Sequence, residues 1–196
     1  MIYDISQPVM ECEVYPGDPQ PQKHVISRME DGALYNLTAF FMCAHNGTHV
    51  DAPRHFLLNG KGVDQVALEK FIGPAFVASH SGEVSAEDAR RLLQKAAAAH
   101  PGAEKRILIK GNATVTLEAA EVFAAAGVDL LGNESQTVGP EDAPMAVHLV
   151  LLKAEVVLLE GIRLAAVPDG AYQLNCAPLN LTGFDGAPCR AVLTEL

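Results

Sequence analysis

The stretch RILIKGNATVTLEAAEVFAAAGVDLL, residues 106–131, sets the fold class of this chain. It opens with a short apolar run, residues 106–110, which predicts a buried strand. Residues 116–126 are helical in composition and stop at Gly127, a residue that commonly follows a helix. Residues 128–131 then predict a second strand. Strand, helix and strand in succession are typical of α/β proteins, in which helices pack on a sheet.

The same alternation extends to both sides of this stretch. Ser85 followed by Asp88 predicts the start of a helix, because each side chain can accept a hydrogen bond from the backbone of the other. That helix should end near His100, which precedes Pro101. Residues 34–43 are rich in aromatic and β-compatible side chains and predict a strand, and the C-terminus also has strand-like composition. We therefore expect a compact α/β fold with a mixed β-sheet.

The strand at 34–43 leads into HNGTHVDAPRH, residues 45–55, which gathers three of the seven histidines. Its candidate ligands are His45, His49, Asp51 and His55. All four are odd-numbered, so an extended chain would point them to one face. A glycine and a proline in the segment disfavour a helix, and the residue after the first histidine is Asn, which excludes a HExxH protease motif. Imidazoles with a carboxylate suit zinc, manganese or a similar cation. The alternative is a solvated loop whose histidines form separate hydrogen bonds.

A second group of candidate ligands lies about one hundred residues downstream. Residues 142–153 predict a helix that carries His148, with Pro144 in its first turn. Residues 156–159 predict an apolar strand that ends at Glu160, where an ionised carboxylate is costly unless it is paired or ligated. Taken alone, His148 is more often a hydrogen-bonded helix residue than a ligand. Glu160 is equally compatible with a strand end that reaches solvent.

Together these residues resemble the cyclase family of metal-dependent hydrolases, which includes the bacterial kynurenine formamidases. The resemblance is strongest in the pattern His45-x-Gly-Thr-His49-x-Asp51-x-Pro-x-His55, followed by His148 and Glu160. Weaker matches occur in the same order along nearly the whole chain: Asp4-Ile-Ser6, Tyr15-Pro-Gly-Asp18, and residues 132–137, 170–174, 177–179 and 183–190.

The resemblance implies a divalent metal site and a fold of the swivelling β/β/α kind. The implied metal ligands are His45, His49, Asp51, His148 and Glu160. Asp51 and Glu160 would bridge two ions, and His55 would be the general acid/base. The ion would be Zn²⁺, with Mn²⁺ or Fe²⁺ as alternatives, in one or two copies per subunit. The family resemblance also implies a homodimer or homotetramer.

Three residues depart from the pattern of the formamidases in this family. Tyr15 stands where a substrate-stacking tryptophan precedes Pro-Gly-Asp, and the chain contains no tryptophan. A tyrosine still offers an aromatic face, so Tyr15 is the expected substrate-binding residue. Glu134 replaces an aspartate, and Gln136 stands where proline is common. We expect these three differences to affect the substrate pocket rather than the metal ligands.

The expected activity is metal-dependent hydrolysis of an amide or formamide, as in N-formylkynurenine plus water giving kynurenine plus formate. A metal-bound hydroxide would attack, with His55 as general acid/base. Alternatives are hydrolysis of a cyclic amide, imide or lactone, a dehydration or cyclisation, or a non-catalytic metal-binding role. No GxSxG nucleophile motif is present, and Cys43 among apolar neighbours is expected to be a buried small hydrophobe.

Length and composition are compatible with a single domain spanning residues 1–196, with 49% hydrophobic residues. The net charge of −10 disfavours nucleic acid and anionic membranes as partners, and the family resemblance implies a small-molecule amide or formamide substrate. The N-terminus lacks a signal-peptide pattern, and the cysteines at 12, 43, 176 and 189 form no CxxC pair. A cytoplasmic protein with reduced thiols is therefore expected.

Overall fold

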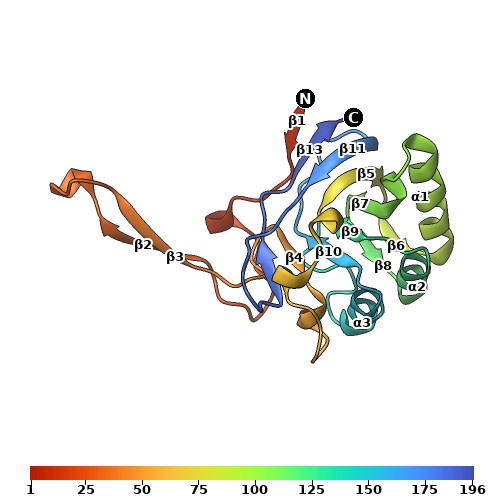
Figure 1. The fold of residues 1–196 in the computed structure, drawn as a ribbon, viewed down its shortest axis with the longest axis horizontal. Helices are drawn as coiled ribbons and strands as arrows, with labels where there is room; N and C mark the ends of the chain where they lie inside the picture. Colours follow the sequence, from red (N-terminus) through yellow and green to blue (C-terminus); the bar gives the residue numbers. More distant parts are fainter.

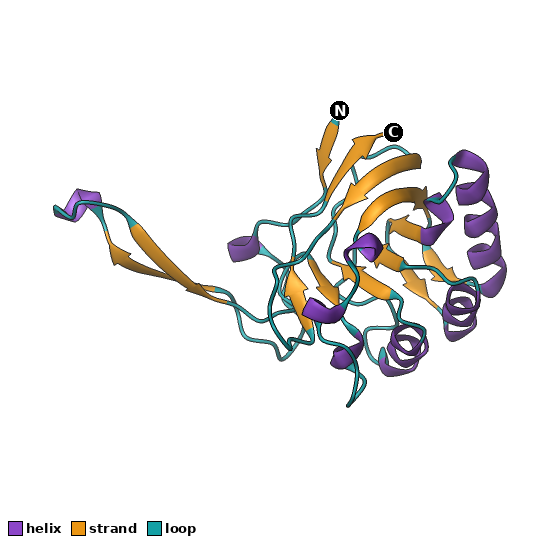
Figure 2. Ribbon diagram, viewed as in Figure 1, coloured by secondary structure: helices purple, strands orange, loops and turns teal.

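The computed structural model describes all 196 residues and is built on a nine-stranded mixed sheet (Figure 1). In spatial order the strands are β1 (Ile2–Asp4), β13 (Val192–Glu195), β11 (Gly170–Asn175), β5 (Ile72–Ser79), β7 (Arg106–Lys110), β9 (Leu130–Asn133), β10 (Val157–Glu160), β4 (His49–Asp51) and β12 (Gly186–Pro188). Three helices pack on one face of this sheet: α1 (Ala86–Ala99), α2 (Leu117–Ala125) and α3 (Met145–Lys153) (Figure 2). The predicted α/β class with a mixed sheet is confirmed.

The centre of the sheet is parallel and its two sides are antiparallel. Strands β5, β7, β9 and β10 run parallel, and each successive pair is connected through one helix. Strands β11, β13 and β1 continue antiparallel from β5, while β4 and β12 continue antiparallel from β10. A short parallel pair, β6 (Gly82–Val84) with β8 (Ala113–Val115), lies before α1 and α2.

Each face of the sheet has its own hydrophobic core, because side chains alternate along a strand. On β7, Ile107 and Ile109 belong to the cluster of 22 buried residues that packs under the helices. Leu108, between them, belongs to a second cluster of 20 buried residues on the opposite face. The central strands are therefore buried on both sides, which explains their nearly continuous apolar sequences.

The predicted helix at 85 begins and ends as expected. Ser85 Oγ accepts a hydrogen bond from Asp88 N at 3.1 Å, and Ser85 N donates to Asp88 Oδ2 at 3.0 Å. These reciprocal bonds satisfy two backbone donors that α1 would otherwise leave free. The helix at 116–126 is confirmed as α2, and Gly127 follows it with a φ of +64°, a conformation that favours glycine.

Several predicted boundaries differ from the structure, and the strand predicted at 128–131 lies two residues later, as β9. Helix α3 begins at Met145, so Pro144 precedes the helix instead of lying in its first turn. The strand predicted over 34–43 is shorter: β3 spans Leu37–Phe41, because the preceding residues form the tip of a hairpin. No helix has the length and apolar character needed to cross a bilayer.

That hairpin is a long arm, residues 22–41, in which β2 (Gln22–Ser27) pairs with β3 and which projects away from the main sheet (Figure 1). It exposes eight large hydrophobic side chains: Val25, Ile26, Met29, Leu34, Tyr35, Leu37, Phe40 and Phe41. The expectation that Cys43 is a buried hydrophobe next to these aromatic residues is wrong. Cys43 is partly exposed, and its Sγ donates to Asp18 Oδ2 at 3.7 Å.

The Asp88 cap should make the stability of the fold depend on pH. Hydrogen bonds from Ser85 lower the pKa of the Asp88 carboxyl below its ordinary value of 3.8. A carboxyl whose pKa is lowered by folding stabilises the folded state above its unfolded pKa, and that contribution is lost as pH falls through the folded value. In urea denaturation, the stability difference between wild type and Asp88→Asn should be largest above about pH 5 and shrink towards about pH 2–3.

Glu87→Gln is the matched control, because it removes a charge from the same turn without touching the bonds to Ser85. A pH-independent difference between wild type and Asp88→Asn would contradict the assigned role of this carboxylate.

Candidate metal centre

The antiparallel pairing of β4 with β10 brings the two predicted ligand groups together. In this register His49 lies opposite Glu160, and Asp51 lies opposite Leu158. Directly opposed residues point to the same face of a sheet. Because Leu158 belongs to the core under the helices, His49, Asp51 and Glu160 also face the helical layer. Three candidate ligands from distant parts of the chain are thus buried side by side.

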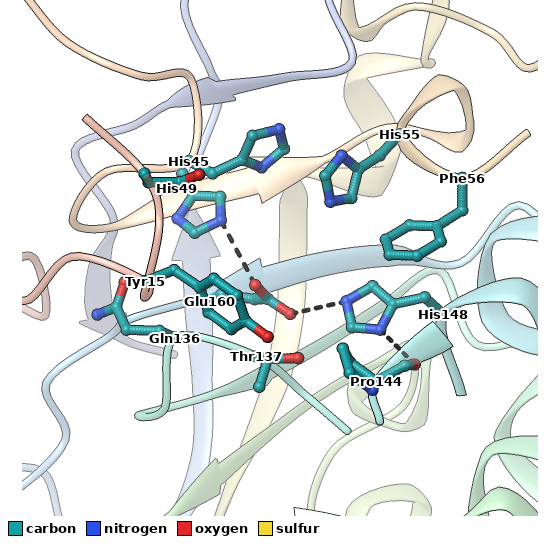
Figure 3. Close-up of a pocket in the computed structure, with 11 residues that line it drawn as sticks. Tyr15, His45, His49, His55, Phe56, Gln136, Thr137, Pro144, His148 and Glu160 are labelled. Atoms are coloured by element: carbon teal, nitrogen blue, oxygen red, sulfur yellow. Dashed lines mark hydrogen bonds and ion pairs between the residues drawn. The ribbon is translucent and has the colours of Figure 1, made fainter. Parts of the chain in front are cut away.

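Helix α3 supplies His148 to the same group (Figure 3). Its Nδ1 donates to the carbonyl of Pro144 at 2.9 Å, which directs Nε2 towards the carboxylates. Nε2 lies 3.3 Å from Glu160 Oε1 and 3.6 Å from Asp51 Oδ2. Glu160 Oε2 in turn lies 3.4 Å from His49 Nε2, and Glu160 Oε1 accepts from Val138 N at 2.8 Å. His148 and Glu160 therefore meet the 45–55 segment, as the family resemblance implied.

His45 and His55 reach the site by turns rather than along a strand. Of the four residues, only His49 and Asp51 lie in β4; His45 precedes it in a turn, and His55 ends a 3-10 turn at Pro53–His55. The expectation that one extended chain aligns all four odd-numbered residues is therefore wrong, although their side chains do converge. His45 Nδ1 lies 2.8 Å from Asp51 Oδ1. The His45 and His55 rings stack with centroids 4.1 Å apart.

The buried carboxylates of the site shift the pKa values of the histidines around them, and these histidines shift the pKa of Asp51 in turn. Burial lowers the pKa of His45, but the nearby Asp51 and Asp185 carboxylates outweigh it and raise that pKa to about 10. Burial is likewise outweighed at His49, where Asp51 and Glu160 raise the pKa to about 10. Burial raises the pKa of Asp51, but His45 and its neighbours hold it well below its ordinary value.

The donor set fits a divalent cation. Two groups of ligand atoms lie within 4.8 Å of one another, His45–Asp51–His55 and His49–Asp51–Glu160, and both include Asp51. The Oδ2 atom of Asp51 is buried without a hydrogen-bond partner, which is costly unless a cation or a ligand compensates it. Mixed imidazole and carboxylate donors are the ligands of zinc, manganese and iron sites.

A cavity of about 250 Å³ opens onto these residues (Figure 3). It is lined by Tyr15, Asp18, His45, His49, His55, Phe56, Gln136, Thr137, Pro144, His148 and Glu160. Tyr15 is held at its rim by a hydrogen bond from its hydroxyl to the carbonyl of Glu141 at 2.9 Å. Phe56 lies against the His55 and His148 rings, with centroids 4.6 and 4.8 Å away.

Besides Tyr15, two residues depart from the family pattern, Glu134 and Gln136, and only one of them lines this cavity. Gln136 does, and both polar atoms of its amide are buried without a hydrogen-bond partner. Glu134 does not, so the expectation that it affects the pocket is wrong. Its carboxylate accepts from Gly111 N at 2.6 Å and from Leu164 N at 2.7 Å, which ties two loops together.

Sequence reasoning missed one acidic residue of the site. Asp185 Oδ2 lies 2.9 Å from His45 Nε2 and 3.3 Å from His55 Nδ1. Hydrogen bonds from His45 and His55 hold the pKa of Asp185 well below its ordinary value. The only sequence signal was its position in the family-like segment 183–190, to which no role was attached.

Comparisons with known proteins agree with this arrangement. Residues 3–140 match the Cyclase family, described as "Putative cyclase". The chain is 35% identical to a kynurenine formamidase of Salinibacter ruber, over 99% of this chain and 97% of that protein. It is 32% identical to a kynurenine formamidase of Erythrobacter litoralis, over 100% and 94%.

Among solved structures, a protein from Bacillus stearothermophilus described as a "predicted metal-dependent hydrolase" superposes with a TM-score of 0.80 and 26% identity, over 98% of this chain and 97% of that one. The sequence match and the shared fold lead to the same conclusion: this chain belongs to the cyclase family of metal-dependent hydrolases.

Proposed function

We propose that this protein hydrolyses the C–N bond of a small non-peptide amide, with an aryl formamide such as N-formylkynurenine as the first substrate to test. One observation carries the proposal: imidazoles and carboxylates from β4, α3 and β10 converge on a buried carboxylate oxygen of Asp51 that has no hydrogen-bond partner. The relatives named as kynurenine formamidases cover the full chain, which supports the same reaction.

The proposed metal ligands are His45, His49, Asp51, His148 and Glu160. Asp51 is common to both groups of clustered donors, which supports its proposed role between two ions. The ion we propose is Zn²⁺, with Mn²⁺ or Fe²⁺ as alternatives and one or two per subunit, because all accept this donor set. When bound, such an ion lowers the pKa of a water molecule and polarises a carbonyl oxygen.

His55 is the proposed general acid/base. Its side chain is partly exposed and lines the cavity, so it can reach both the solvent and a bound substrate. In the forward reaction it would take a proton from the attacking water and deliver a proton to the departing amine nitrogen. A correctly placed proton relay of this kind contributes about 10²–10⁴-fold to the rate.

Tyr15 and Phe56 are the proposed contacts for the apolar part of the substrate. Both rings line the cavity, whose volume of about 250 Å³ suits a small molecule with one aryl group. Tyr15 presents less stacking area than the tryptophan of the family pattern. This substitution, together with the unpaired Gln136 amide, favours a second candidate substrate class, a cyclic amide, imide or lactone. A non-catalytic metal-binding role is the alternative of a different class.

We also propose that residues 1–196 work as a single domain in the cytoplasm. The residues of the site come from most of the chain, from Tyr15 to Asp185, which supports a single domain. Cys12, Cys43, Cys176 and Cys189 are all free thiols, which suits a reducing compartment.

A homodimer or homotetramer is the proposed assembly, with the arm of residues 22–41 as its interface. The arm exposes eight large apolar side chains along one hairpin, and extended apolar exposure of this kind marks interaction surfaces. At its base, Phe40 and Met42 line a cavity of about 570 Å³ together with Val9, Met10 and Leu179. In a dimer with a twofold axis, the apolar arm of each copy could pack into the apolar groove of the other copy.

The roles of Asp51 and His55 can be separated by measuring metal and activity in the same variants. Asp51→Ala should abolish metal binding and hydrolysis together, because it removes the shared ligand. His55→Ala should retain the metal and lose about 10²–10⁴-fold in kcat, because it removes only the proton relay. Elemental analysis and steady-state kinetics measure the two effects. Full metal content in Asp51→Ala would contradict its bridging role, and loss of metal in His55→Ala would make His55 a ligand.

The substrate class can be tested with formyl-anilides, N-formylkynurenine and cyclic imides supplied to the same metal-loaded preparation. We expect formamides to be turned over fastest, with the released amine measured by absorbance. Tyr15→Ala should raise KM for aryl formamides, and Tyr15→Trp should lower it, because stacking area changes in those directions. Faster turnover of cyclic imides would favour cyclic amides, imides or lactones as the substrate class. The absence of turnover with all of these substrates would contradict the proposed hydrolysis.

The arm can be tested with two leucines that are equally exposed. Leu34 at the hairpin tip and Leu58 in a loop outside the arm are each 93% exposed. Leu34→Lys should shift the protein towards monomers in analytical ultracentrifugation, because it places a charge in an apolar interface. Leu58→Lys should leave the assembly unchanged. An oligomer that survives Leu34→Lys combined with Ile26→Lys would exclude the arm as the interface.

A further inference from the structure

Asp185 touches two histidines of the site with one atom. Its Oδ2 lies 2.9 Å from His45 Nε2 and 3.3 Å from His55 Nδ1, and the two rings stack 4.1 Å apart with an angle of 30° between their planes. A carboxylate oxygen only accepts hydrogen bonds, so each nitrogen that faces it must carry a hydrogen. One oxygen therefore selects the protonated nitrogen in two neighbouring imidazoles.

The selection has a different consequence in each ring. Once a cation is bound beside Asp51, the hydrogen that Asp185 holds on Nε2 of His45 would leave Nδ1, 2.8 Å from Asp51 Oδ1, as the nitrogen that faces the cation. His55 keeps its hydrogen on Nδ1, which leaves Nε2, 4.0 Å from Asp51 Oδ2, as the nitrogen able to accept a proton. A histidine that ligates a metal commonly donates its other N–H to a carboxylate, which fixes the ring and its tautomer.

The backbone around Asp185 is held on both sides, so the carboxylate is fixed relative to the ligands. The carbonyl of Asp185 accepts from Ala52 N at 2.8 Å, and Gly186 pairs with Asp51 at the start of β12. A β-carbon at Gly186 would lie 2.7 Å from His45 Cε1 and 2.7 Å from the carbonyl oxygen of Val50. The glycine is thus required for the His45 ring to lie beside β12, within reach of Asp185.

We propose that Asp185 is a positioning residue that orients the metal ligand His45 and the proton relay His55 through a single shared carboxylate oxygen. The proposal rests on the proposed function, since it assigns Asp185 to the ligands and the general base of that site. It adds a residue from the C-terminal part of the chain, 140 positions from His45 in sequence. Its role is to hold two rings rather than to contact substrate.

Asp64→Ala is the matched control for variants of Asp185. Asp64 Oδ1 accepts from Gly183 N at 2.8 Å, so it supports the same loop without bonding to any imidazole. Asp185→Ala removes both acceptor contacts with the histidines, whereas Asp185→Asn keeps one neutral acceptor oxygen. Circular dichroism and thermal denaturation of all three variants report whether each remains folded.

The first measurement is the affinity of the metal-free proteins for Zn²⁺, determined by competition with a chelator. Removal of a carboxylate that orients a metal ligand typically weakens metal binding or activity about 10–100-fold. We expect a loss of this size for Asp185→Ala, a smaller loss for Asp185→Asn and none for Asp64→Ala. Equal affinity in wild type and Asp185→Ala would overturn the proposal, as would an equal loss in Asp64→Ala.

The second measurement is the ¹⁵N spectrum of the histidine rings in the Zn²⁺-loaded proteins. His55 should carry its hydrogen on Nδ1 in wild type and Asp64→Ala, and should become a mixture of tautomers in Asp185→Ala. An unchanged His55 tautomer in Asp185→Ala would overturn the assigned orientation. Neither measurement uses substrate, so a wild-type protein that hydrolyses no amide would refute the proposed function while both results still decide the role of Asp185.

Discussion

The site depends on the antiparallel pairing of β4 with β10. This ladder places His49 opposite Glu160 and fixes which face of the sheet Asp51 occupies. A shift of one residue would turn each of these side chains to the opposite face, away from α3. The same shift would move the carboxylates of Asp51 and Glu160 into the second hydrophobic core, which holds Val50 and Leu159 and where an unpaired charge is costly. Hydrophobic packing thereby determines the positions of charged groups.

Buried acid groups of this kind require compensation, and the surrounding elements supply it in different ways. Glu160 accepts a hydrogen bond from Val138 N, while Asp51 has one oxygen beside His45 Nδ1 and a second oxygen without a hydrogen-bond partner. On the outer side, Asp185 extends the network through His45 and His55 towards solvent. Solvent exposure therefore increases from the buried oxygen of Asp51 to the partly exposed carboxylate of Asp185, with the two imidazole rings between them.

Much of the scaffold was predictable from sequence, because its signals are local. The Ser85–Asp88 cap and Gly127 marked helix ends through backbone chemistry that acts within a few residues. The hairpin arm gave the opposite result, since its apolar residues led to the expectation that Cys43 is buried, whereas residues such as Phe40 lie on the surface. The pattern of exposure depends on tertiary packing and on what covers the arm, which composition alone does not encode.

The ligand set was accessible because the 45–55 spacing is specific, yet the reason first given for its convergence was incomplete. His45 lies in a turn and His55 in a 3-10 turn, and the alternation of side chains along a strand does not describe either of them. Asp185 escaped notice because it contacts His55 from 130 residues away and follows no spacing rule. Contacts of that range are set by the order of strands in the sheet, as in the neighbouring placement of β12 and β4.

The insertion of β4 between β10 and β12 also sets the order of events during synthesis. His49 leaves the ribosome more than one hundred residues before its partner Glu160, a delay of roughly 5–20 s at about 5–20 residues per second. Asp185 emerges later still. Throughout that interval the nascent chain carries its histidine-rich segment without β10 and β12, so the geometry of the site cannot form before these two strands have been synthesised.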